Sequence, residues 1–95
     1  MEQITGNRVV VSVVGNDKKG IIAKVTTKLA ENQVNILDIS QTIMQGFFTM
    51  VMVVDITDYA GDIESLSSQF QTLEEQLEVK IRFQHEDIFN FMHRI

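Results

Sequence analysis

The chain has 95 residues, which is the length of a single domain. It carries 13 acidic and 8 basic residues, for a net charge of −5, and 44% of its residues are hydrophobic. The hydrophobic fraction excludes a disordered chain, and the acidic balance excludes the positive surface that nucleic-acid binding needs.

The first third of the chain predicts a strand, a loop and a helix. Residues 8–14 are rich in β-branched valine, which favours a strand. Hydrophobic residues stand at both odd and even positions of this segment, so both faces of the strand are hydrophobic. Residues 15–20 contain turn-forming Gly, Asn and Asp. In residues 21–32, Ile21, Val25 and Leu29 recur at helical spacing. We expect Asp17 to cap this helix or to complement its dipole.

The middle of the chain predicts a β-hairpin over residues 34–56. Residues 34–44 alternate between hydrophobic and polar side chains, and residues 47–56 form a second strand that is hydrophobic at both parities. Gln45-Gly46 between them is a tight-turn signal.

The last third predicts a helix, a strand and a short C-terminal helix. Asp62 is the expected N-cap of a helix with a regular hydrophobic stripe. Residues 78–84 alternate as a strand with one solvated face. Residues 86–95 carry hydrophobic side chains at helical spacing. The two stripes consist of Tyr59, Ile63, Leu66, Phe70, Leu73 and Leu77, and of Ile88, Phe89, Met92 and Ile95.

The element order predicts an α+β fold, a ferredoxin-like βαββαβ sandwich. Right-handed crossovers place both main helices on one face of an antiparallel four-stranded sheet of order 4-1-3-2. We expect one domain over residues 1–95, with a core at 8–85 and the extra helix at 86–95. Strands 1 and 3 are hydrophobic on both faces, so either the C-terminal helix or a second copy should cover the open side.

Catalytic and metal-binding signals are weak in this sequence. It has no cysteine, which excludes disulfides, thiol nucleophiles and cysteine metal sites. No nucleotide-binding glycine motif is present, and no serine or threonine has a sequence partner for nucleophilic catalysis. His85 and His93 are two candidate metal ligands, which we interpret as ordinary polar residues because a site needs three or four. We expect no enzyme activity, no cofactor and no metal.

The location of the protein is also indicated by what the sequence lacks. No hydrophobic run approaches the roughly 20 residues of a membrane span. Met1-Glu2-Gln3 is acidic and polar, unlike the start of a signal peptide. We therefore expect a cytoplasmic protein without a membrane or nucleic-acid partner.

The loop before the first helix is the strongest candidate binding site. Backbone N–H groups at a helix N-terminus attract carboxylates, and Asp17 offers a carboxylate for an ammonium group. Together these groups suit a zwitterion. The alternative is a helix cap in a solvated turn, which is the more common arrangement.

Two segments resemble the signature of the ACT-domain family, in particular small bacterial proteins made of one ACT domain and ACT modules of the glycine-cleavage-repressor type. The segments are Gly15-Asn16-Asp17-Lys18-Lys19-Gly20-Ile21-Ile22-Ala23-Lys24-Val25 and Leu29-Ala30-Glu31-Asn32-Gln33-Val34-Asn35-Ile36. The resemblance spans residues 8–95. It implies the same βαββαβ fold and regulatory binding of a small ligand, usually an amino acid, between two domains paired through strand 2 and helix 1.

The resemblance also implies which residues bind the ligand. These are Asp17, Asn35 and the backbone of Lys18 to Ile22, within the set Gly15, Asn16, Asp17, Lys18, Lys19, Gly20, Ile21, Ile22, Asn35 and Ile36. Three positions depart from the family pattern: Lys19 replaces a frequent proline, Gly15 replaces the histidine of serine-binding members, and Gln33 replaces a frequent glycine. We expect a homodimer that signals through a regulatory partner protein. The alternative is a docking domain of the same fold that binds no ligand.

Overall fold

The computed structural model describes residues 7–86 of the chain. The order of elements within this range is that of the predicted βαββαβ fold. The elements are β1 (Arg8–Asn16), α1 (Ile21–Glu31), β2 (Asn35–Met44), β3 (Phe47–Asp55), α2 (Ile63–Gln69), α3 (Gln71–Leu77) and β4 (Val79–His85).

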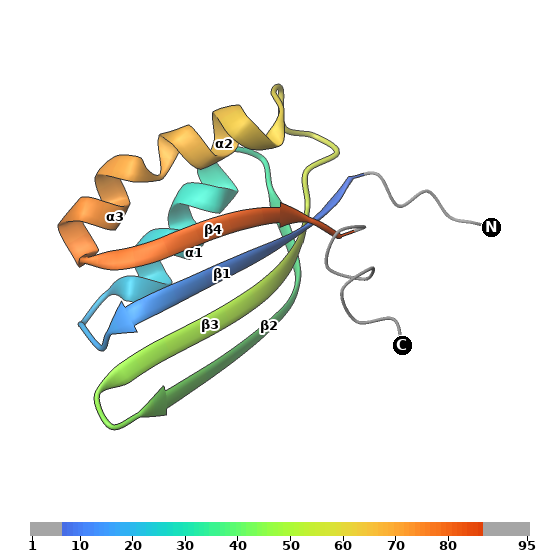
Figure 1. Ribbon diagram of the computed structural model, residues 1–95. Coiled ribbons are helices and arrows are strands. Elements are labelled where there is room, and N and C mark those ends of the chain that lie inside the picture. Colours follow the sequence, from blue (N-terminus) through green and yellow to red (C-terminus); the bar gives the residue numbers. More distant parts are fainter. Residues whose placement is uncertain (1–6, 87–95) are drawn as a thin grey trace.

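The four strands form one antiparallel sheet of order β2-β3-β1-β4. This is the predicted order 4-1-3-2 read from the opposite edge, so the predicted sheet and its strand order are confirmed. The helices lie together on one side of the sheet, behind β4 and β1, while the β2–β3 hairpin extends away from them (Figure 1). β2 is therefore an edge strand with little helix cover.

The hydrophobic core lies between this sheet and the helices. The register pairs Val11 of β1 with Met52 of β3 and Phe83 of β4, so residues of one parity share a face. From the sequence alone, it was undecided whether the odd or the even positions of β1 and β3 face the helices. The structure buries one set of β1 and β3 side chains under the helices: Val9, Val11, Val13, Phe48, Met50, Met52 and Val54.

The second predicted helix is present, but it is interrupted at Phe70. The Phe70 N–H donates to the Ser67 carbonyl, three residues back, and not to the carbonyl four residues back. The Ser68 hydroxyl donates to the Glu64 carbonyl, a contact that bends helices. The bend leaves Phe70 buried, with its ring centroid 5.1 Å from that of Phe83.

The two helix starts differ in how they are capped. The Asp62 side chain accepts a hydrogen bond from the Ser65 N–H at 2.8 Å, and the Ser65 hydroxyl oxygen accepts one from the Asp62 N–H at 3.2 Å, so the predicted cap of the second helix is confirmed. The prediction that Asp17 caps α1 is wrong. The N-cap of α1 is Gly20, with a φ of 87°, and no side chain caps this end among the described residues.

Residues 1–6 and 87–95 lie outside the described range. The predicted C-terminal helix and its stripe therefore fall outside that range, apart from Glu86. Within residues 7–86, no helix is long and hydrophobic enough to cross a membrane.

Candidate functional site

The loop between β1 and α1 forms one end of the molecule. Gly15 and Asn16 end β1, and Ile21 and Ile22 begin α1. The Asp17 N–H donates to the Gly46 carbonyl at 2.8 Å, which ties the loop to the turn of the β2–β3 hairpin. On the other side, the Lys18 ammonium group donates to the Glu78 carboxylate at 2.8 Å. The loop is therefore held between the hairpin turn and the turn that precedes β4.

The loop leaves the N-terminus of α1 open. Gly20 adopts a left-handed conformation, which a side chain disfavours, and its carbonyl accepts the Lys24 N–H at 2.9 Å. The first turn of α1 contains no acidic residue. Ile22 is 37% exposed beside this end, and Asp17 is exposed. The arrangement offers backbone donors to an anionic group and a carboxylate to a cationic one.

The exposed ion pair next to the loop has an electrostatic effect on Glu78. The hydrogen bond from Lys18 and its positive charge lower the pKa of the Glu78 carboxyl group. Both side chains are exposed to solvent, so the pair contributes little to the stability of the fold.

The other predicted site residues, Asn35 and Ile36, lie at the opposite end of the sheet. Asn35 pairs with Asp55, whereas Asn16 pairs with Phe47. Eight residues of β3 separate these two levels, which is about 26 Å at 3.3 Å per residue. The structure therefore does not bring Asn35 and the Asp17 loop together within one copy.

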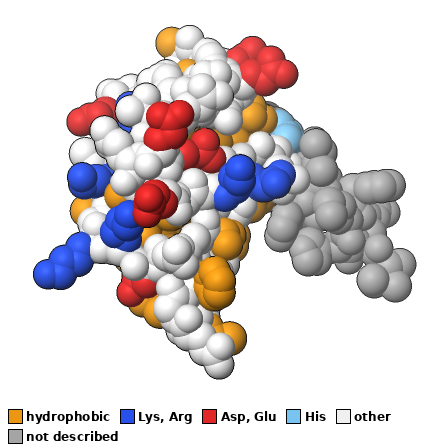
Figure 2. All heavy atoms as spheres, turned by 60° about the vertical axis from the view of Figure 1, so that its left-hand side comes forward, with side chains coloured by type: hydrophobic (Ala, Val, Ile, Leu, Met, Phe, Trp, Pro, Cys, Tyr) orange, Lys and Arg blue, Asp and Glu red, His pale blue; other side chains and the backbone are white. Residues whose placement is uncertain are grey.

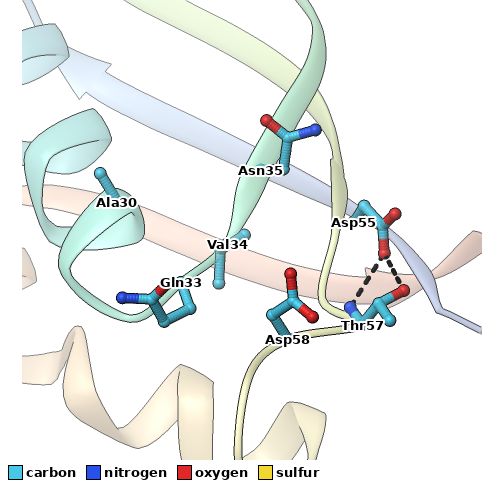
Figure 3. Close-up of a pocket in the computed structure, with 7 residues that line it drawn as sticks. All are labelled: Ala30, Gln33, Val34, Asn35, Asp55, Thr57 and Asp58. Carbon is cyan, nitrogen blue, oxygen red and sulfur yellow. Dashed lines mark hydrogen bonds between the residues drawn. The ribbon is translucent and has the colours of Figure 1, made fainter.

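Asn35 lines a depression of about 400 Å³ between the end of α1 and the end of β3 (Figure 3). The remaining lining residues are Ala30, Gln33, Val34, Asp55, Thr57 and Asp58. The backbone and hydroxyl of Thr57 both donate to the Asp55 carboxylate, and these bonds lower the pKa of Asp55. Two carboxylates beside an amide favour a cationic group over an anionic one.

The sequence interpretation did not assign these carboxylates to a site. Asp55 ends a strand that is hydrophobic at both parities, and Asp58 lies in the loop after it, so they resembled ordinary strand-end residues. Part of the signal is the hairpin itself, because a turn at Gln45-Gly46 places Asp55 near the start of the first strand. The register shift between Ile36 and Asp38, which the turn does not predict, then sets Asp55 opposite Asn35.

β2 is an edge strand that runs from Asn35 to the hairpin turn that the Asp17 loop contacts. A register shift between Ile36 and Asp38 bends the strand, and the Asp38 carboxylate accepts the Ile39 N–H at 2.9 Å. Ile39 and Ile43 are 43% and 57% exposed. Hydrophobic side chains gather on the hairpin, at the bottom of the view in Figure 2. An exposed strand edge with hydrophobic side chains is a surface suited to pairing with another strand.

No group of three or more metal-ligating side chains converges within residues 7–86. His85 ends β4, and His93 lies outside the described residues. The metal hypothesis therefore gains no support from the described part of the chain.

Comparison with known proteins decides the family. The model of the ACT domain matches residues 7–84, which is most of the chain. This chain belongs to the ACT-domain family. A UPF0237 protein of Methanocaldococcus jannaschii is 52% identical over 89 residues, which cover 94% of this chain and 99% of that protein.

Solved structures agree with this assignment. An ACT domain protein from Streptococcus pneumoniae superposes with a TM-score of 0.77 at 42% identity, covering 88% of this chain and 94% of that one. A candidate glycine cleavage system transcriptional repressor superposes with a TM-score of 0.73 at 21% identity, covering 88% of this chain and 49% of that one. The second likeness shows the shared fold. ACT domains are in general regulatory modules that bind small ligands.

Proposed function

We propose that this protein is a cytoplasmic, non-enzymatic regulatory module that binds an amino acid between two copies of the chain and signals through a partner protein. The observation that carries the proposal is the separation of the two halves of the site. The Asp17 loop and Asn35 belong to opposite ends of one sheet, so a ligand that contacts both needs a second copy.

Antiparallel pairing of two β2 edges would close this gap. In such a pair, the first residues of one β2 lie beside the last residues of the other. Asn35 of one copy then approaches the hairpin turn of its partner, and the Asp17 loop is bound to that turn through Gly46. The pairing would also bury the exposed Ile39 and Ile43 side chains.

The chemistry of the two halves suits an amino acid. The open N-terminus of α1 offers N–H donors to the ligand carboxylate. Asp17 from the same loop and the Asn35 side-chain oxygen from the second copy offer acceptors to the ligand ammonium group. The ligand side chain would then lie near Ile22, which is partly exposed.

A docking domain that binds no ligand is the second candidate function. It is favoured by the large hydrophobic side chains that the β2–β3 hairpin exposes, among them Met44 at 66% and Phe47 at 59%. Lys19 and Gly15, which depart from the pattern of ligand-binding relatives, also fit this alternative.

A thermal-shift screen with the twenty amino acids tests the proposal. A ligand at about 100 times its dissociation constant stabilises the folded state by about 2.7 kcal/mol, which is several degrees in Tm for a domain of this size. We expect one amino acid, or a few similar ones, to raise Tm, and Asp17→Ala and Asn35→Ala each to abolish the shift.

Asp58→Ala is the matched control, because Asp58 lies in the depression beside Asn35 but not in the proposed contact set. Its Tm shift should equal that of the unaltered chain. If no amino acid raises Tm, the docking function replaces ligand binding. A partner captured from extract equally well with and without amino acids would then be the expected result.

A further inference from the structure

The side of the sheet that faces away from the helices, here called the open face, is hydrophobic along its centre. Its central side chains come from β1 and β3 and differ in exposure. Val14 and Phe47, at the hairpin end, are 46% and 59% exposed, and Val51 is 37% exposed. Val53 is half-buried, and Val10, at the opposite end, is 5% exposed. The hydrophobic surface thus becomes less exposed toward the end at which β4 finishes.

The chain leaves β4 on the side of the open face. Gln84 pairs with Val10, so its side chain lies on the open face, and Glu86 has the same parity two residues later. The Glu86 carboxylate lies 3.4 Å from the Arg8 guanidinium, and its side chain is 16% exposed. Arg8 shares the parity of Val10. This ion pair places Glu86, the last described residue, on the open-face side of β1.

The segment that follows has the length and the composition to cover Val10 and Val53. Residues 87–95 contain Ile88, Phe89, Met92 and Ile95 at the spacing of one helical face. A helix of nine residues is about 13 Å long. The distance from β4 to β3 is two strand spacings, or about 10 Å. Such a helix crosses β1 and β3 but ends short of Phe47.

A second copy fits the open face less well. If two copies already pair through β2, a closed assembly of four chains stacks β4 on β4 across the open faces. Lys80 and Arg82 are exposed on that side of β4, at the levels of Val14 and Ser12. Stacking would bring these positive charges against each other, and like charges across an interface are unfavourable.

We propose that residues 87–95 form a helix that lies across the open face of the same molecule, with its hydrophobic stripe against Val10 and Val53. The helix covers this part of the sheet and leaves the β2 edge and the hairpin end as the exposed hydrophobic surface. Pairing between copies is thereby restricted to the β2 side.

Paired cysteines test this contact directly, because the natural chain has none. The test pair is Val53→Cys with Met92→Cys. The control pair is Lys24→Cys with Met92→Cys, since Lys24 is exposed on α1, on the other side of the sheet. Under mild oxidation we expect the test pair to form an intramolecular disulfide at least about tenfold faster than the control pair, because the thiols meet only in the test pair.

Two results of the cross-linking would overturn the proposal. Disulfide-linked dimers from the test pair would place the segment on a second copy. Equal rates for the two pairs would mean that the segment does not occupy the open face. Neither result depends on ligand binding, so the cross-link and the amino-acid screen fail independently.

A stability comparison provides a second test. Phe89→Ser removes a residue of the stripe, whereas Asn90→Ser changes a residue outside it. We expect Phe89→Ser to lower Tm by about 5 °C or more and Asn90→Ser to leave it nearly unchanged. Equal Tm values for these two variants would contradict the proposed contact.

Discussion

Gly15 shows how one residue joins the candidate site to the fold. It pairs with Phe48 of β3 on one side and Val79 of β4 on the other. A Cβ atom at this position would lie 2.8 Å from Val79 Cγ1 and 3.0 Å from the Glu78 carbonyl oxygen. The close approach explains why a glycine occupies this position.

We predict that Gly15→Ala destabilises the protein by about 1–3 kcal/mol, the range for overpacking a well-packed site. The Val79 side chain and the Glu78 backbone would have to shift together, which disturbs the start of β4. Urea unfolding followed by circular dichroism measures the loss. Asn16→Ala is the matched control, because Asn16 is the exposed neighbour, and its effect should stay within about 0.5 kcal/mol. Equal effects of the two changes would contradict the packing argument.

At the scale of elements, the sequence predicted each strand and helix of the described range within a few residues. The signals were strong where hydrophobic spacing and turn residues agreed, as at Gln45-Gly46, where both residues have positive φ. The break at Phe70 was not predicted, because the hydrophobic stripe continues through it without a change of spacing. The break arises from the tertiary contact with Phe83 and from the Ser68 hydroxyl, neither of which alters that spacing.

The two helix starts illustrate a limit of local reasoning about caps. Asp17 and Asp62 are both acidic residues before a helical stripe. Asp62 immediately precedes its helix and caps it, whereas Gly20 separates Asp17 from α1 by a left-handed turn. That turn requires a backbone conformation that spacing does not reveal.

We predict that Asp62→Ala lowers the free energy of unfolding by about 1 kcal/mol, the usual effect of removing an N-cap. The loss arises because the Ser65 N–H, which donates to Asp62, is left without its side-chain acceptor. Asp58→Ala in the same connection is the control for the removal of one negative charge, and it should have little effect. Urea unfolding of both variants at one ionic strength measures the difference. Similar losses in both would assign the effect to charge and not to the cap.

At the scale of the whole molecule, the fold was predictable and the geometry of the site was not. The order of elements and the handedness rules determine the sheet, and the structure has that order. The placement of Asn35 relative to Asp17 depends on strand direction and register. Asp17 and Asn35 are 18 positions apart in the sequence, and this spacing does not reveal that they lie at opposite ends of the sheet. Under the proposed function, in which one ligand contacts both residues, that ligand therefore needs two copies.

This separation allows a test that depends on the shared site. In a two-fold pair, each site takes its loop from one copy and its Asn35 from the other. Asp17→Ala destroys both loops, and Asn35→Ala destroys both asparagine contacts, so neither variant alone binds the ligand. In a mixed pair, one site combines the two altered residues, while the other combines an intact loop with an intact Asn35.

We predict that mixing the two inactive variants restores ligand binding. Random exchange makes half of the pairs mixed, and half of the sites in those pairs are intact, so about a quarter of the wild-type sites return. Isothermal titration calorimetry with the amino acid from the screen measures that fraction, at the wild-type dissociation constant. The control is a chain with both substitutions mixed with either single variant, which restores nothing because every site then lacks a residue. Binding that stays absent after exchange would place both residues in one copy's site or in none, and would contradict the shared site.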